Sequence, residues 1–235
     1  MTRTPIWSAI AGTLTSEIRG GHYRPGEKLP TEAALAARFG VNRHTVRHAL
    51  ANLAEAGMVH ARRGSGVFVT ARPTEYRLGQ RVRFHQNVLA VGQVPSRRIT
   101  RAETRAADAE EAGALALPQG EAVHVVEGIS LADGHPLAAF RSVFPAARFP
   151  GLPGQVVAEG SITRALAALG LSDYTRHETR LTAQLADPVL ALALLLRPGA
   201  AVLQSVAVNV DAGSRPIEYG ITWFAGDRVT LTLAA

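Results

Sequence analysis

Residues 40–50 of this 235-residue chain, GVNRHTVRHAL, gather the side chains best suited to contact nucleic acid. Two arginines, two histidines, an asparagine and a threonine are interleaved with apolar residues at helical spacing. Arginine can donate two hydrogen bonds to the edge of a guanine, and arginine and threonine can both bind phosphate. The stretch therefore predicts either a helix that reads DNA or an ordinary solvated surface helix, and the surrounding elements must decide between them.

Three short helices are predicted in the first 56 residues. An apolar residue at every fourth position indicates an amphipathic helix over 5–19. Thr31 can cap a second helix that ends at Gly40, and Asn42 can cap a third that runs to about Ala56. Because so short a turn links the second and third helices, the segment predicts a helix-turn-helix.

A hairpin is expected next, over MVHARRGSGVFVT (58–70), with two short strands joined by a Gly-Ser-Gly tip. Three helices followed by such a hairpin form a winged helix. In that arrangement the third helix lies in the major groove of DNA, and arginines beside the tip can enter the minor groove. The expected DNA contacts are Arg43, His44, Thr45 and Arg47 on the helix, and Arg62, Arg63, Gly64 and Gly66 on the hairpin.

The formal charge is concentrated in the same segment. Residues 1–72 hold ten basic and four acidic residues, whereas residues 73–235 hold fifteen of each, so the first segment carries the whole net charge of +6. A compact basic segment is typical of a protein that binds a phosphate-rich partner. A solubilising surface would produce the same excess, so charge alone leaves both interpretations open.

Composition and motifs exclude or disfavour several other classes of protein. The chain has no cysteine, which excludes disulfides, thiolate metal sites and thiol nucleophiles. Its eight histidines are scattered, and no phosphate-binding loop, dinucleotide fingerprint or catalytic triad is recognisable. No apolar run approaches the roughly 18 residues of a membrane span. We therefore expect a cytoplasmic protein without a metal, a cofactor or a membrane partner.

Residues 73–80 are polar with a proline and predict a linker to a second domain over 81–235. Alternating polarity and turn residues predict strands over 96–105, 121–132, 136–144, 173–184, 201–210 and 215–233. Helices are predicted over 85–91, 108–115, 161–169 and 187–195. Successive strands joined by short turns favour an antiparallel sheet with helices packed on it, which is an α+β domain.

One pattern runs through residues 29–69, LPTEAALAARFGVNRHTVRHALANLAEAGMVHARRGSGVFV. Its pieces L-P-T-E, F-G-V, R-x-T-V-R-x-A-L and R-x-G-x-G-x-F-V resemble the DNA-binding domain of GntR-family transcriptional regulators. The resemblance implies two DNA contacts besides those above, at Thr31 and Asn42. Some members carry an arginine where this chain has Ala33, so the resemblance implies one contact fewer here.

A second pattern covers the second domain with VGQVPSRRI, L-x-L-P-x-G-x-x-V (115–123), SLADGHPLA, the predicted helix at 161–169 and RPIEYGITWFAGDRVTLT. These pieces resemble the effector-binding UTRA domain of the HutC subfamily, whose fold is similar to chorismate lyase. Two more, FRSVFPAARFPGL and DYTRHETRLTA, look most like PhnF-like regulators of phosphonate utilisation. The resemblance implies a ligand-responsive regulator that represses phosphonate uptake or degradation genes as a homodimer on a palindromic operator.

The same resemblance implies a pocket for a small anionic effector, possible contacts of which can be named. Free N–H groups and hydroxyls at helix starts favour an anion. Residues at two such starts are Phe84, His85, Gln86, Asn87 and Ser161. Arg141, Tyr174 and Arg176 lie on predicted strands, and Glu218 and Tyr219 lie in the P-I-E-Y stretch where the family commonly places ligand contacts. For a phosphonate bearing an amine, cations would hold one end and Glu218 the other.

Each of these assignments has a plainer alternative. The arginines could pair with surface acids, the tyrosines could lie in the core, and His85 could be a solvated helix cap. Sensors of amino-sugar phosphates carry an R-x-R pair before the A-D-G turn, and here those positions are Gly128 and Ser130. This departure favours a smaller or differently oriented anion, with an amino-sugar phosphate or another metabolite as the alternative.

Two other classes of function stand beside the regulator. A lyase-like enzyme would suit the fold that the second domain resembles, but no catalytic arrangement supports it, so no enzymatic activity is expected. A non-specific DNA-binding structural protein would have little use for a large neutral domain.

Overall fold

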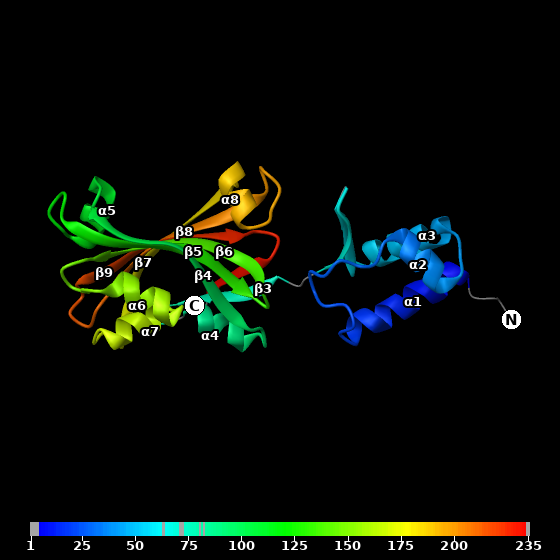
Figure 1. Ribbon diagram of the computed structural model, residues 1–235, viewed down its shortest axis with the longest axis horizontal. Coiled ribbons are helices and arrows are strands. Elements are labelled where there is room, and N and C mark those ends of the chain that lie inside the picture. Colours follow the sequence, from blue (N-terminus) through cyan, green and yellow to red (C-terminus); the bar gives the residue numbers. More distant parts are fainter. Residues whose placement is uncertain (1–4, 63, 71–72, 80, 82, 234–235) are drawn as a thin grey trace. The chain divides into compact units, whose positions relative to one another are not determined.

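Two units, Met1–Arg72 and Pro73–Ala235, divide the chain in the computed structural model (Figure 1). The structure describes residues 5–62, 64–70, 73–79, 81 and 83–233. No helix within these described ranges is long and apolar enough to cross a membrane.

The first unit is a helix-turn-helix with a β-hairpin, which confirms the predicted winged helix. Its elements are α1 (Ile6–Arg19), α2 (Glu32–Phe39), α3 (Arg43–Glu55), β1 (Val59–Arg62) and β2 (Gly66–Val69). Thr31 caps α2, since its Oγ1 accepts a hydrogen bond from Ala34 N at 3.2 Å. Asn42 caps α3 by accepting one from Thr45 N at 2.8 Å. Gly40 ends α2 in the left-handed conformation (φ +64°), which permits the sharp turn into α3.

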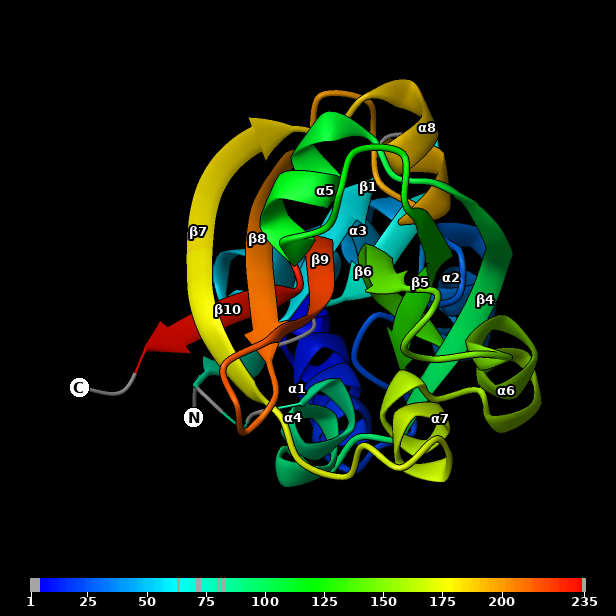
Figure 2. The ribbon, with the colours of Figure 1, turned by 90° about the vertical axis from the view of Figure 1, so that its left-hand side faces the viewer.

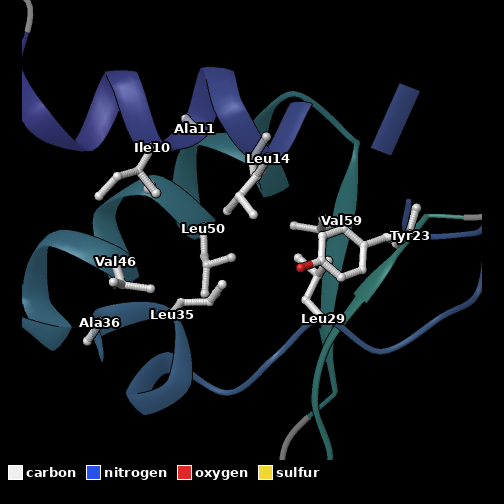
Figure 3. Packing of buried hydrophobic residues seen from close by; sticks show 13 residues of the cluster. Ile10, Ala11, Leu14, Tyr23, Leu29, Leu35, Ala36, Val46, Leu50 and Val59 are labelled. Atoms are coloured by element: carbon white, nitrogen blue, oxygen red, sulfur yellow. The ribbon is translucent and has the colours of Figure 1, made fainter. Parts of the chain in front are cut away.

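The apolar faces of the three helices and the hairpin form one core (Figure 3). Leu14 of α1, Leu35 of α2 and Val46 of α3 are fully buried there. Burying each such side chain contributes about 1.5–3 kcal/mol to folding. This core fixes the orientation of α3, so its polar residues are directed to solvent.

The second unit is built on a six-stranded antiparallel sheet with the strand order β4-β5-β6-β9-β8-β7. The strands are β4 (Pro95–Ala106), β5 (Ala122–Ala132), β6 (His135–Pro145), β7 (Thr175–Leu185), β8 (Ala201–Val210) and β9 (Pro216–Ala225). The helices are α4 (Phe84–Ala90), α5 (Ala109–Leu115), α6 (Leu152–Glu159), α7 (Ile162–Ala168) and α8 (Pro188–Ala193). The predicted α+β architecture is confirmed, although α6 was not among the predicted helices.

Helices lie on both faces of this sheet (Figure 2). Side chains alternate between the two faces along each strand. On one face, α6 and α7 pack with Phe140 and Ile217. On the other face, α5 packs with Val143 and Tyr219, and α8 packs with Ala139. A strand residue can therefore line a site beside α7 only if its side chain lies on the face of the sheet that α6 and α7 cover.

Five residues of the linker that the sequence predicted over 73–80 belong to the fold of the second unit. Thr74–Leu78 form strand β3, which pairs in parallel with β10 (Val229–Leu233) in a small separate sheet. Tyr76 and Leu78 are buried in a hydrophobic cluster of the second unit. The prediction failed because Pro73 and the polar residues were taken to mark a linker, although Thr74–Leu78 alternate buried and exposed side chains, and because the strand partner lies near the end of the chain.

Candidate nucleic-acid interface and effector cavity

The start of α3 presents polar side chains to solvent. Arg43, His44 and Arg47 are exposed, whereas the apolar residues between and after them are buried in the core. An accessible helix start with such donors is what the reading of base edges in the major groove requires. The structure thus places the predicted helix contacts on one accessible end of α3.

Thr31, Asn42 and Thr45 also serve the local fold. Besides capping α3, Asn42 Oδ1 accepts a hydrogen bond from the Thr45 hydroxyl at 2.9 Å. These contacts hold the two helix starts in place. Their own contacts with DNA stay predictions.

Glu32, the acid of the L-P-T-E pattern, holds Arg47. Arg47 Nε and Nη2 donate to the two carboxylate oxygens at 3.0 and 2.7 Å, a two-point ion pair between α3 and α2. The hydrogen bond from Arg47 holds the pKa of the Glu32 carboxyl below its usual range. A carboxylate on this surface repels phosphate, so Glu32 offsets part of the positive charge at the start of α3.

The hairpin tip depends on glycine. Gly64 and Gly66 have φ angles of +76° and +115°, which L side chains rarely adopt. Arg62 lies over the ring of Phe68, with 4.7 Å between its guanidinium carbon and the ring centroid. The DNA contacts expected of these residues stay predictions, and Arg63 lies outside the described residues.

A cavity of about 100 Å³ lies in the second unit, lined by the sheet and by residues near the starts of α4 and α7. Five of the predicted effector contacts line it: Phe84, His85, Tyr174, Arg176 and Glu218. Small residues of the central strands also line it and leave room above the sheet, namely Ser142, Ser205, Ala207, Gly220 and Thr222.

A second hollow of about 230 Å³ adjoins this cavity and shares His85 with it. Gln86 and Ser161, two more of the predicted contacts, line this hollow. Burial, with the charges of Arg97 and Arg164, lowers the pKa of His85, so this imidazole is neutral near pH 7.

Asn87, predicted to contact the effector, instead fixes β3 to α4. It is buried, and its amide group accepts a hydrogen bond from the backbone N–H of Arg77 at 2.9 Å. It also donates to the backbone carbonyl of Arg77 at 3.1 Å. The prediction was wrong because residues at a helix start share free N–H groups but point their side chains in different directions.

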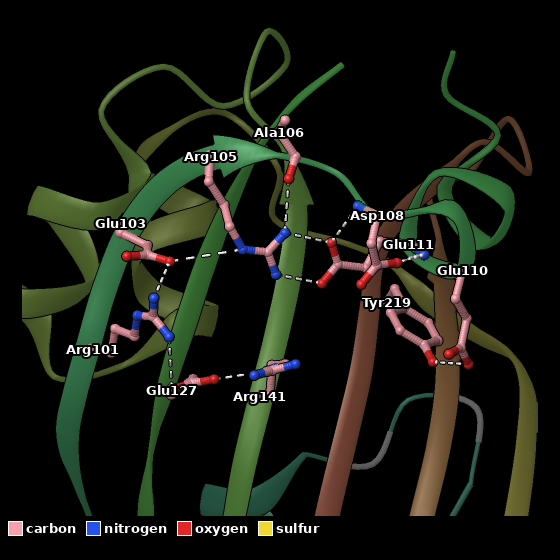
Figure 4. Close-up of polar contacts among 10 residues, drawn as sticks. All are labelled: Arg101, Glu103, Arg105, Ala106, Asp108, Glu110, Glu111, Glu127, Arg141 and Tyr219. Atoms are coloured by element: carbon pink, nitrogen blue, oxygen red, sulfur yellow. Dashed lines mark hydrogen bonds and ion pairs between the residues drawn. The ribbon is translucent and has the colours of Figure 1, made fainter. Parts of the chain in front are cut away.

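Arg141 and Tyr219, also predicted to contact the effector, belong to the opposite face of the sheet (Figure 4). Arg141 Nε donates to Glu127 at 2.7 Å, and the Tyr219 hydroxyl donates to Glu110 at 2.6 Å. Side chains alternate along a strand, so the residues next to them line the cavity instead. The prediction was wrong by one position on each strand.

Several polar residues of the cavity were missed by the sequence patterns, among them Arg97 on β4, Tyr76 on β3, Asn209 on β8, and Arg81 and Arg83 before α4. Arg97 stands in the piece VGQVPSRRI, and its guanidinium carbon lies 4.7 Å from the centroid of the Phe140 ring. Alternation along β4 would have separated Arg97 from its exposed neighbour Arg98. Tyr76 was missed because β3 was not recognised as a strand.

Charged groups in the cavity lack matching partners. Arg97 Nε and Arg176 Nε and Nη1 are buried and have no hydrogen-bond partner in the described part of the chain. Burial lowers the pKa of Arg97 and raises the pKa of the Tyr76 phenol. Because buried donors are normally hydrogen-bonded, these nitrogens are suited to receive the oxygens of an anion.

Known protein families match both units. Residues 7–69 match the gntR family of bacterial regulatory proteins, and residues 90–230 match the UTRA domain. The first range contains the winged helix, and the second contains the six-stranded sheet.

Relatives of similar length are named as transcriptional regulators. The uncharacterised HTH-type transcriptional regulator RB1450 of Rhizobium meliloti is 39% identical over 97% of this chain and 94% of its own length. The probable transcriptional regulator PhnF of Escherichia coli is 33% identical over the same shares of the two chains. The HTH-type transcriptional repressor NagR of Bacillus subtilis is 26% identical over 96% of this chain and 93% of its own.

Solved structures show the same architecture. PhnF from Mycobacterium smegmatis has a TM-score of 0.69 and is 26% identical over 96% of this chain and 98% of its own. The effector domain of that protein, solved separately, has a TM-score of 0.61 over 68% of this chain and 98% of its own. At 22% identity, this second likeness concerns the fold.

Proposed function

Since this chain belongs to the GntR family of bacterial regulatory proteins, in the UTRA-containing HutC subfamily, we propose that it is a ligand-responsive repressor of phosphonate uptake or degradation genes. The first unit binds DNA. The second unit binds a small anionic effector, which shifts the protein between states of different DNA affinity. In this proposal the protein works in the cytoplasm, and the fold that resembles a lyase catalyses no reaction.

One observation supports an anionic effector. Arg97 and Arg176 have buried guanidinium nitrogens that lack hydrogen-bond partners among the described residues. Burying a charge without a partner costs several kcal/mol. Two such cations in one small cavity are best satisfied by an oxyanion, which accepts charge-assisted hydrogen bonds from both. Neutral ligands would leave the two charges uncompensated.

A departure in the sequence favours a phosphonate over an amino-sugar phosphate. Gly128 and Ser130 stand where amino-sugar-phosphate sensors are expected to carry arginines. The similarity to two proteins named PhnF supports the same choice, and the similarity to NagR supports an amino-sugar phosphate as the second candidate.

We further propose a homodimer on a palindromic operator, with one winged helix on each half-site. The second unit carries an exposed apolar strip within residues 185–195. Its members, Leu185, Val189, Leu192 and Leu195, are 62–78% exposed. Four large apolar side chains so exposed within eleven residues of sequence suit burial against a second copy of the chain.

The experiment that tests the proposal uses the full-length protein. Its operator is first selected from random DNA duplexes, and fluorescence anisotropy then follows release of that duplex as candidate effectors are added. Aminoalkylphosphonates should release it at lower concentration than inorganic phosphate or hexosamine phosphates. Release by a hexosamine phosphate alone would favour the second candidate, and no release by any of these anions would contradict the proposed effector class.

A further inference from the structure

The cavity of the second unit keeps opposite charges apart instead of pairing them. Glu218, Asn209 and Arg176 stand directly opposite one another on β9, β8 and β7. At the usual spacing of strands, the Cα atoms of Glu218 and Arg176 are about 10 Å apart. Asn209 Nδ2 donates to Glu218 Oε2 at 2.7 Å. None of the ion pairs within 4.0 Å in the described ranges involves Glu218.

The positive charge of Arg97 and Arg176 comes from the two edge strands of the sheet, β4 and β7. Arg97 reaches the cavity from β4, and its guanidinium carbon lies 4.7 Å from the ring centroid of Phe140 and 5.5 Å from that of Phe84. Aromatic faces hold a guanidinium without using its N–H groups. The buried nitrogens of Arg97 and Arg176 can therefore donate to the oxygens of a ligand.

We propose that the effector is a small zwitterion, with a doubly charged phosphonyl group at Arg97 and Arg176 and a cationic amine at Glu218; this inference rests on the proposed function. Besides these two guanidiniums and Glu218, Arg81 and Arg83 line the cavity; Arg81 pairs with Asp173 at 3.0 Å, and Arg83 lies over the ring of Tyr174. The lining therefore carries an excess of positive charge. A phosphonate dianion that bears an ammonium group carries one net negative charge and offsets part of this excess, whereas a sulfonate or carboxylate with the same amine carries no net charge and leaves it in place.

A matched pair of ligands tests the role of the amine by calorimetric titration of the full-length protein at pH 8. 2-Aminoethylphosphonate and propylphosphonate differ only in an ammonium group against a methyl group of similar size. The wild-type protein should bind the amine at least about tenfold more tightly, as a charge-assisted hydrogen bond predicts. Glu218→Gln should bind the two compounds about equally. Glu127→Gln, a carboxylate on the opposite face of the sheet, should keep the preference.

A second set of ligands tests the anion. 2-Aminoethanesulfonate and β-alanine carry the same amine, and each should bind at least about tenfold more weakly than 2-aminoethylphosphonate. Arg97→Met should weaken both phosphonates by at least about tenfold, whereas Arg141→Gln should leave them unchanged. Thermal unfolding followed by circular dichroism shows whether each variant is folded. Arg97→Lys, which keeps the charge but loses the fork of donors, replaces Arg97→Met if that variant does not fold.

The outcomes separate this inference from the proposed function. Equal affinity of the wild-type protein for the two phosphonates would overturn the assignment of Glu218 to an amine, while the anionic effector would stand. A sulfonate or a carboxylate as the tightest ligand would overturn the doubly charged group. If no anion in either set binds or releases the operator, the proposed effector class itself fails.

Discussion

Among individual residues, Glu32 and Arg47 decide how the first unit presents its charge to DNA. Their two-point ion pair restrains the Arg47 guanidinium, and the carboxylate repels phosphate near Arg43. Glu32→Gln removes the repulsion and frees Arg47 for the DNA backbone. We expect binding of unrelated DNA to tighten about threefold to tenfold, with weaker discrimination in favour of the operator, because a backbone contact carries no sequence information.

Anisotropy titrations of Glu32→Gln over a range of salt concentrations measure this change. One added phosphate contact should steepen the dependence of log K on log salt by about 0.9. Glu55→Gln, at the exposed C-terminal end of α3, changes the net charge equally and serves as the control. An unchanged salt slope in Glu32→Gln would show that the ion pair does not restrain Arg47.

At the same scale, alternation along strands explains which cavity residues could be predicted. Glu218 and Arg176 line the cavity, whereas Arg141 and Tyr219 project from the other face of the sheet. The period of a strand tells which residues share a face, but not which face meets α4 and α7. That choice depends on helices from elsewhere in the chain, so these predictions were open to an error of one residue.

At the scale of elements, Gly128 lets β5 pack closely against its neighbours. A Cβ atom there would lie 2.5 Å from the carbonyl oxygen of Arg98 and 2.9 Å from the ring of Phe140. Gly128→Ala must move the strand or the ring, and we expect it to lower the free energy of unfolding by about 1–3 kcal/mol. Effector affinity should fall as well, because the Arg97 guanidinium lies over that ring.

Denaturant unfolding and calorimetry measure the two effects of Gly128→Ala. Gly154→Ala on α6 is the control, since a Cβ atom at that position meets no atom within 4 Å. The same unfolding midpoint in Gly128→Ala as in the wild-type protein would mean that β5 accommodates a methyl group, and the close packing described above would not matter for stability.

The turn between β8 and β9 depends on a carboxylate. Asp211 Oδ1 accepts hydrogen bonds from the backbone N–H groups of Gly213 and Arg215 at 2.8 and 2.9 Å, and its side chain pairs with Arg148 and with the Arg215 guanidinium. The backbone hydrogen bond from Arg215, followed by those of the two guanidiniums, holds the pKa of Asp211 well below its usual range. The ionised form is therefore stabilised by folding.

This carboxylate makes stability depend on pH in a stated direction. Because the folded pKa is lower than the unfolded pKa of about 3.9, the contribution is complete above that pH and is lost as the pH falls toward the folded pKa. Asp211→Asn should lower the urea midpoint at pH 7, and its difference from the wild-type protein should shrink from about pH 5 to pH 2. Asp173→Asn, at a side chain that is 55% exposed, is the control. A difference that stays constant across this range would contradict the role of the charge.

For the whole molecule, short-range sequence patterns predicted individual elements better than the pairing of segments that lie far apart in the chain. The helix-turn-helix is specified by caps and a glycine turn that lie close together in the chain, so its elements could be read directly. β3 and β10 pair across almost the entire second unit; β10 lies within the strand predicted over 215–233, whereas the segment of β3 was taken for a linker. Short-range patterns also could not predict the whole lining of the cavity, because Tyr76 and Arg97 line it only once β3 and β4 have paired with strands from elsewhere in the chain.

We expect two copies of the chain to associate through the second unit, because its exposed apolar strip suits burial against a second copy. The strip begins at the end of β7, an edge strand whose unpaired backbone groups add to the apolar side chains. Leu185→Asp combined with Leu192→Asp should place charges in the interface and give a monomer in sedimentation equilibrium. Operator binding should weaken as well, because both copies hold a palindrome. Val157→Asp, on an α6 side chain that is 62% exposed, should leave both properties unchanged. A double variant that remains dimeric would place the interface on another surface.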